Sequence, residues 1–376
     1  MDWKDTKTML DPVIAFFERI FHAIGRGIGM VISFILWPFV AVGRWFQGRN
    51  WLIRAPIIIL LLLLIFGYGQ FLWVAERWVN WDPDYPAQYD VNAGTVGEPV
   101  NASDPNSCVP SQIVQVTRDL IDFNVNQNTW IPSHPLSKAG LFGIEWKNTP
   151  FMDNKAAFQL GINTVIRRTT IELADRLGRV RGTSQINQNL QDAKQAMSYN
   201  EDAWWLTFSP PFIQPSTAER HRTAIEALDT FNTEMADCKG EFDARTDNLL
   251  QFLERVTGDI GSTSDILRSR MEASDLGWFD PRADDRFWFT YGQLYAYYGI
   301  LIATESDFSD IFDDRRIGSV WNVARDQLRQ ALDMTPFIIS NGNEASWIMP
   351  SHLATMGFYL LRVRSNLVEM RDILDR

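Results

Sequence analysis

The sequence lacks the short motifs that mark most enzyme families. It contains no His-Glu-x-x-His, no Cys-x-x-Cys, no Gly-x-Ser-x-Gly and no phosphate-binding Gly-Lys-Ser/Thr pattern. Histidine is also scarce, and His134, His221 and His352 stand without the close spacing of metal ligands. We therefore predict no catalytic residue, no cofactor and no metal site, and we regard an enzyme as the less favoured class.

Positive charge is scarce as well, and it is unevenly distributed. The 376 residues include 35 Lys and Arg against 46 Asp and Glu, a net charge of −11. Residues 1–54 hold seven basic and four acidic side chains, a balance of +3, so the rest of the chain carries −14. An acidic domain repels nucleic acid, and we exclude nucleic acid as a partner.

Cysteine occurs only twice, at Cys108 and Cys238. In an oxidising compartment, two such residues can form one disulfide that ties an N-terminal loop to a central helix. The alternative is two separate buried thiols. The spacing along the chain does not decide between them.

Against these absences stands one long apolar run. Residues 55–75 contain no charged side chain and are long enough to cross a bilayer as a helix. Arg44, Arg49 and Arg54 precede the run, and positive residues beside a span remain in the cytoplasm. We predict a transmembrane helix over 55–75, a cytoplasmic or interfacial region over 1–54, and an exported domain after the span.

A second apolar stretch lies closer to the N-terminus. Its first half carries charges at helical spacing, as in a helix that lies in the membrane interface. Residues 27–43 are uncharged, and they either cross the membrane or form an interfacial or re-entrant helix, which we favour. Both alternatives leave the exported domain on the same side. Gly25 and Gly29 are spaced to let two membrane helices approach closely, although glycines can also simply loosen a bent helix.

The exported part reads as a linker followed by a helical domain. Pro, Asp, Asn, Gly and Ser dominate much of 76–111, which we predict to be an extended linker. Apolar residues then recur at helical spacing through 112–376, interrupted by irregular segments. We predict an all-α domain with long antiparallel helices, at most a minor hairpin near 335–349, and helices over 112–122, 154–177, 184–197, 216–276 with a break at Arg245, 280–305, 318–333 and 350–374.

Carboxylates cluster where one of these helices is expected to begin. Asp280, Asp284 and Asp285 could supply the acid and base of a glycosidase, but acids at a helix start also cap free amides and complement the helix dipole. Glu145, Asp153, Glu172 and Asp175 form a second candidate set. Tryptophans could line a ligand groove or pin irregular segments to the helices. The tryptophans concerned are Trp130, Trp146, Trp204 and Trp205.

Several blocks in order resemble an uncharacterised bacterial family of inner-membrane-anchored proteins. They are Phe151–Asn154, Phe158–Gly161, Leu177–Arg179, Gly182–Ser184, Arg245 with Asp247–Leu250, Gly277–Asp280, Leu294–Tyr298, His352–Ala354 and Gly357–Leu361. The resemblance covers most of the chain after residue 50, while residues 124–140 and the apolar N-terminal extension diverge. It implies a Gram-negative envelope setting and supplies neither an activity nor catalytic residues.

These observations lead to one functional expectation and two alternatives. We expect a non-enzymatic protein anchored in the inner membrane, whose periplasmic domain serves as a scaffold, assembly factor or accessory subunit. The expected partners are the lipid bilayer, other inner-membrane or periplasmic proteins, and a second copy of the chain. The alternatives are an envelope hydrolase acting on glycan or lipid and a periplasmic ligand sensor.

Overall fold

A computed structural model describes most of the chain. It covers residues 22, 29–30, 33–34, 36–89, 94–101, 104–141, 143–146, 149, 152–179, 185–207, 209–273, 280, 282–342 and 350–376. The chain divides into two compact units, Met1–Gly69 and Gln70–Arg376. Each unit is described by itself below.

The first unit is dominated by helix α2, Trp51–Glu76, whose last residues belong to the second unit. Asn50 caps its start, accepting a hydrogen bond of 2.7 Å from the amide of Trp51. Arg54 donates to the carbonyl of Phe46 at 3.0 Å, and Arg49 stacks over Trp45. Of the described helices, α2 is the one long and apolar enough to cross a membrane, and it contains the predicted span. Membrane anchoring is thus supported at this coarse level.

The structure describes only one of the two glycines that were predicted to let membrane helices approach. Gly25 lies outside the described residues, whereas Gly29 is helical, with open space where a side chain would project. Most of the stretch before residue 33 also lies outside them, so the number of spans and the helix-packing role of the pair remain predictions.

The second unit is all-α in its described part, apart from one small two-stranded antiparallel sheet. Its elements, in chain order, are η1 (Tyr85–Gln88), β1 (Pro99–Asn101), β2 (Asp104–Cys108), α3 (Gln112–Asp122), η2 (Phe123–Gln127), α4 (Pro135–Ala139), α5 (Asn154–Glu172), η4 (Leu173–Leu177), α6 (Gln188–Met197), α7 (Thr217–Ala236), α8 (Thr246–Glu272), α9 (Ala283–Asp307), α10 (Ser309–Arg315), α11 (Gly318–Leu332) and α12 (His352–Leu374).

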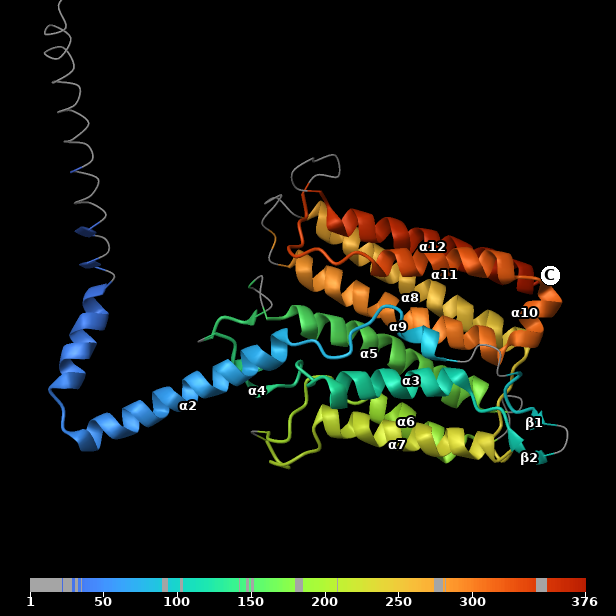
Figure 1. Ribbon diagram of the computed structural model, residues 1–376, viewed down its shortest axis with the longest axis horizontal. Helices are drawn as coiled ribbons and strands as arrows, with labels where there is room; N and C mark the ends of the chain where they lie inside the picture. The colour runs from blue at the N-terminus through green and yellow to red at the C-terminus, as the bar shows by residue number, and fades with distance from the viewer. Residues whose placement is uncertain are drawn as a thin grey trace, which may run out of the picture. The chain divides into compact units, whose positions relative to one another are not determined.

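Helix α9 forms the centre of the unit, and large aromatic side chains surround its circumference. It is flanked on one side by α3 and α5, with α6 and α7 beyond, and on the other by α8, α11 and α12 (Figure 1). Its tyrosines Tyr291, Tyr295 and Tyr297 are buried. Such a helix is stabilised by burial of its whole surface rather than of one stripe.

The tightest pairing joins α5 to α9, which run parallel. A Cβ added to Gly161 would lie 2.1 Å from the carbonyl oxygen of Phe289, and one added to Gly292 would lie 2.1 Å from that of Phe158. Only glycine allows the two backbones to approach so closely. Because the helices are parallel, both of their N-termini meet at the same end of the unit.

The two ends of the unit differ, and we name them for use below. At the disulfide end, Cys108 is bonded to Cys238, with Cα atoms 5.2 Å apart. At the opposite end, which we call the α2 end, buried Phe71 packs against the rings of His134 and Trp146. There Lys155 donates to the carbonyls of Val74 and Arg77 at 2.8 and 2.7 Å, which caps the C-terminus of α2.

Three features differ from the sequence-based expectations. Residues 76–111 are not a free linker: Trp78, Trp81, Tyr85 and Tyr89 pack against the core, because an irregular segment rich in aromatics gains more by burial than by solvation. The helix expected from Asp280 starts at Ala283 instead. Three short features were not predicted, because they are too short to show a hydrophobic period: α4, α10 and the β1–β2 pair.

Candidate functional site

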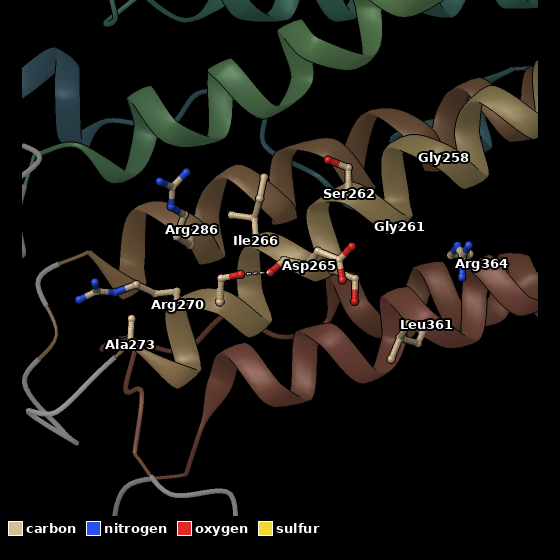
Figure 2. Close-up of a pocket in the computed structure, with 12 residues that line it drawn as sticks. Gly258, Gly261, Ser262, Asp265, Ile266, Arg270, Ala273, Arg286, Leu361 and Arg364 are labelled. Atoms are coloured by element: carbon tan, nitrogen blue, oxygen red, sulfur yellow. Dashed lines mark hydrogen bonds between the residues drawn. The ribbon is translucent and has the colours of Figure 1, made fainter.

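A groove of about 830 Å³ runs along α8 where it faces α12 and the start of α9 (Figure 2). The α8 side of the groove consists largely of small residues. These are Gly258, Gly261, Ser262, Ser264, Ser269 and Ala273. A Cβ at Gly258 would meet nothing within 4 Å, so this stretch of the floor is open. Exposed Ile266 and Leu361 add apolar surface.

Three arginines line the same groove. Figure 2 shows Arg270 and Arg286 toward one end of it and Arg364 toward the other. Among the residues that the structure describes, the guanidinium groups of Arg286 and Arg364 are exposed and make no ion pair, whereas that of Arg270 is held by Asp280. Asp265 also lines the groove, but it pairs with Arg268 at 3.1 Å. Arg286 and Arg364 therefore make the groove a candidate binding site for an anionic partner.

Asp280 is a structural carboxylate rather than a free acid. Its side chain is buried; besides Arg270, it accepts hydrogen bonds from the side chain of Asn341 at 2.9 Å and from the amide of Arg282 at 3.1 Å. Burial opposes ionisation, but these hydrogen bonds outweigh it and lower the pKa of Asp280. The carboxylate of Asp280 therefore fixes the guanidinium of Arg270 at the edge of the groove.

The other predicted acids lie on the far side of the α9 N-terminus. Asp284 and Asp285 in its first turn meet Asp153 at the start of α5, beside a cavity of about 480 Å³. Burial, and then the neighbouring Asp285, raise the pKa of Asp284 to about 7. Burial, and then Asp285 and Asp284, raise the pKa of Asp153 to about 9.

Asp153 retains its proton at neutral pH for a clear reason. Its side chain is 6 % exposed, and no N–H or O–H group among the described residues donates to either carboxyl oxygen. The nearby carboxyl of Asp285 adds to the effect of burial, because two neighbouring carboxyl groups resist carrying negative charge together. Asp153 precedes α5 without capping it.

The remaining candidates do not join either site. Buried Glu172 pairs with Arg176 and Arg255, and Asp175 pairs with Lys194. Glu145 lines the cavity beside Asp153. Among the described residues no group of His, Cys, Asp and Glu has the arrangement of a metal site.

The four tryptophans do not share one groove. Trp130 donates its indole N–H to the carbonyl of Glu201 at 2.9 Å, and Trp146 donates to that of Leu136 at 3.0 Å. Both are buried and pin irregular segments to the helices, whereas Trp205 is exposed.

Sequence reasoning missed the groove arginines. The small residues of α8 recur at spacings of three and four, which is legible in the sequence, but Arg364 is far from them along the chain. The structure brings its Nε to 3.1 Å from the position of a Cβ on Gly261. That proximity depends on how α8 packs on α12.

The fold and these two sites define the class of protein. It is a largely α-helical unit that continues directly from a helix apolar enough to cross a membrane. Within that class, the chain belongs to the family described as "Uncharacterized protein conserved in bacteria (DUF2333)", whose model matches residues 146–278 and 266–376. No curated protein and no solved structure matches the chain.

Proposed function

We propose that this protein is a non-enzymatic scaffold or accessory subunit of a bacterial inner-membrane complex. In this proposal α2 spans the membrane, residues 1–54 face the cytoplasm and the second unit is periplasmic. Arg44, Arg49 and Arg54 before the apolar run support the orientation. The bond between Cys108 and Cys238 supports an oxidising compartment, because such bonds rarely persist in the bacterial cytosol.

The α8–α12 groove is the observation that carries the binding role. Its floor of small residues admits the close approach of another helix, and Ile266 and Leu361 offer apolar contact. Arg286 and Arg364 supply charge that nothing in the described part of the chain neutralises. The partner that fits this chemistry is an amphipathic helix with acidic residues beside an apolar stripe.

The two alternatives have weaker support. A glycosidase needs two carboxyl groups that face each other across a substrate cleft, whereas Asp153 and Asp284 are both buried. Asp280 is committed to Arg270 and Asn341. A sensor needs an apolar pocket, but charged side chains, including Lys138, Glu201 and Asp285, line the 480 Å³ cavity.

A peptide-binding assay tests the proposed groove. The full chain in detergent is titrated with a labelled amphipathic helix bearing Glu residues, and with a matched helix bearing Lys in their place. We expect the acidic helix to bind and the basic one not to bind. The double variant Arg286→Glu/Arg364→Glu should weaken binding at least about tenfold, because each exposed ion pair contributes up to about 1 kcal/mol.

The matched control is the double variant Arg315→Glu/Arg316→Glu, which makes the same total charge change at the end of α10, at the disulfide end. It should leave the affinity unchanged. A photo-crosslinker at Leu361, compared with one at exposed Val323 on α11, then tests the groove in cells. Equal binding of acidic and basic helices, equal effects of the double variant and the control, or equal crosslinking from both positions would contradict the groove assignment.

A further inference from the structure

The α2 end of the second unit exposes an unusual amount of apolar surface. Six large side chains in three connections between helices are more than half exposed, and we call them the apolar rim. They are Ile144 (57 %), Trp205 (56 %), Phe212 (59 %), Ile213 (72 %), Phe337 (101 %) and Ile338 (70 %). In the described part of the disulfide end, Val100 alone among large apolar side chains is comparably exposed.

A glycine turn and backbone hydrogen bonds hold the loops that carry the rim side chains. Gly140 has a φ of +61°, and a Cβ there would lie 2.1 Å from the carbonyl oxygen of Ile144, so the turn before Ile144 requires glycine. In the second connection, the amide of Thr207 donates to the carbonyl of Phe212 and that of Gln214 to the carbonyl of Trp205, both at 3.0 Å. The exposure is therefore fixed by hydrogen-bonded turns.

The third connection is fixed in a similar way. The amide of Ser340 donates to Nδ1 of His352 at 2.9 Å, and the amide of His352 donates to the carbonyl of Ser340 at 3.0 Å. These bonds tie the segment that carries Phe337 and Ile338 to the start of α12. All three connections lie at the same end of the helical unit (Figure 1).

The occupant of this surface follows from the chain itself. The apolar run of α2 continues into the unit at this same end without a linker, and Phe71 and Lys155 fix its last turns there. Exposed Trp73 lies under the guanidinium of Arg77, a pairing typical of the membrane–water interface. Covalent continuity with a bilayer-crossing segment places lipid within reach of the rim.

We propose that the apolar rim inserts into the interfacial layer of the bilayer, so that the α2 end of the second unit rests on lipid. This inference rests on the membrane anchoring in the proposed function. Aromatic and branched aliphatic side chains on loops favour this layer, where apolar groups penetrate about 5–10 Å. A partner protein or a second copy on the rim would be a different outcome of the test below.

Fluorescent labelling of the full chain in vesicles tests the proposal. Two variants with one added cysteine each, Phe212→Cys and Phe337→Cys, are labelled with a small environment-sensitive dye, with the native disulfide left oxidised and verified by intact mass. The protein is reconstituted in vesicles of phosphatidylethanolamine and phosphatidylglycerol. Lipids with a spin-label quencher near the headgroup should lower the emission of both labels about twofold, since they lie at that depth.

Two controls separate this inference from the anchoring on which it rests. A label at Leu62→Cys lies deep in the apolar run and reports anchoring in parallel vesicles whose lipids carry the quencher far down the acyl chain, while Val323→Cys labels an exposed apolar position on α11, away from the rim. Quenching at 62 but not at 212 or 337 overturns the rim proposal alone. No quenching at 62 means that anchoring itself fails. A third outcome is a dye at position 212 whose emission shows that it is shielded from water but is not lowered by the quencher. This outcome indicates a protein partner and also overturns the proposal.

Discussion

Two buried carboxylates, Asp307 and Asp153, lie at opposite ends of the second unit and differ in how they are hydrogen-bonded. At the disulfide end, the carboxylate of buried Asp307 accepts hydrogen bonds from Ser111 Oγ at 2.6 Å and from the amides of Gln112 and Ile113 at 2.8 and 3.1 Å. At the α2 end, Asp153 receives none from an N–H group of the described residues. One end is built for stability, whereas the other retains unsatisfied polar groups beside a cavity, an open groove and exposed apolar loops.

The disulfide should make the largest difference between the ends. Cys238→Ser opens a loop closed across a sequence separation of 130 residues, and we expect it to lower the free energy of unfolding by about 4 kcal/mol. Urea unfolding of wild type and variant measures the change. Reduction of the wild-type protein should reproduce it and should not affect the variant further. A loss below about 1 kcal/mol would show that the disulfide end does not depend on its covalent bond.

A matched pair of alanine substitutions tests the two carboxylates directly. Asp307→Ala strands the hydroxyl of Ser111 and two buried amides, and should cost about 3 kcal/mol. Asp153→Ala strands no donor N–H and should cost much less. Both are measured by urea unfolding at neutral pH. Equal losses would break the comparison between the ends.

The smallest expected effect, counted per pH unit, is the pH dependence that Asp153 contributes. The pKa of Asp153 rises from its usual 3.8 to about 9 in the folded protein, so the folded state binds the proton more tightly. Its stabilising contribution is complete below about pH 4 and is lost as the pH rises toward 9. Asp153→Asn should therefore flatten the fall in stability with pH, by at most about 1.4 kcal/mol per pH unit.

The difference between the two profiles isolates Asp153 from other groups. Asp284 and Asp307, each with a pKa raised to about 7 chiefly by burial, act in the same sense at lower pH. Lys155, whose pKa burial and then Arg77 lower to about 8, acts in the opposite sense above that value. Identical slopes for wild type and Asp153→Asn would mean that Asp153 ionises normally in the fold.

Local patterns in the sequence predict the helices well, but they do not predict which residues come together when the helices pack. The capping sequence at Ser216 marks the start of α7, where Ser216 accepts a hydrogen bond from the amide of Glu219, and the predicted break at Arg245 separates α7 from α8. These signals are contained in a few neighbouring residues. The meeting of Asp153 with Asp285 depends instead on the parallel register of α5 and α9.

The same limit explains why the groove was not predicted. Its small residues lie on one helix and were readable, but Arg364 and Arg286 come from two others, and no local rule specifies how those helices pack. Asp280 shows the reverse case. Its position before a helix is legible in the sequence, but its partners, Arg270 and Asn341, come from separate elements that no local pattern identifies.

The central position of α9 has a consequence for how the chain matures. Synthesis proceeds from the N-terminus, so α3 and α5 emerge before α9 begins at Ala283. Until then their apolar faces lack the helix that covers them, and Cys108 and Cys238 can already close a covalent ring around α3 to α7. The nascent protein thus passes through a stage in which an oxidised half-domain presents bare core surface, where a chaperone has its natural point of action.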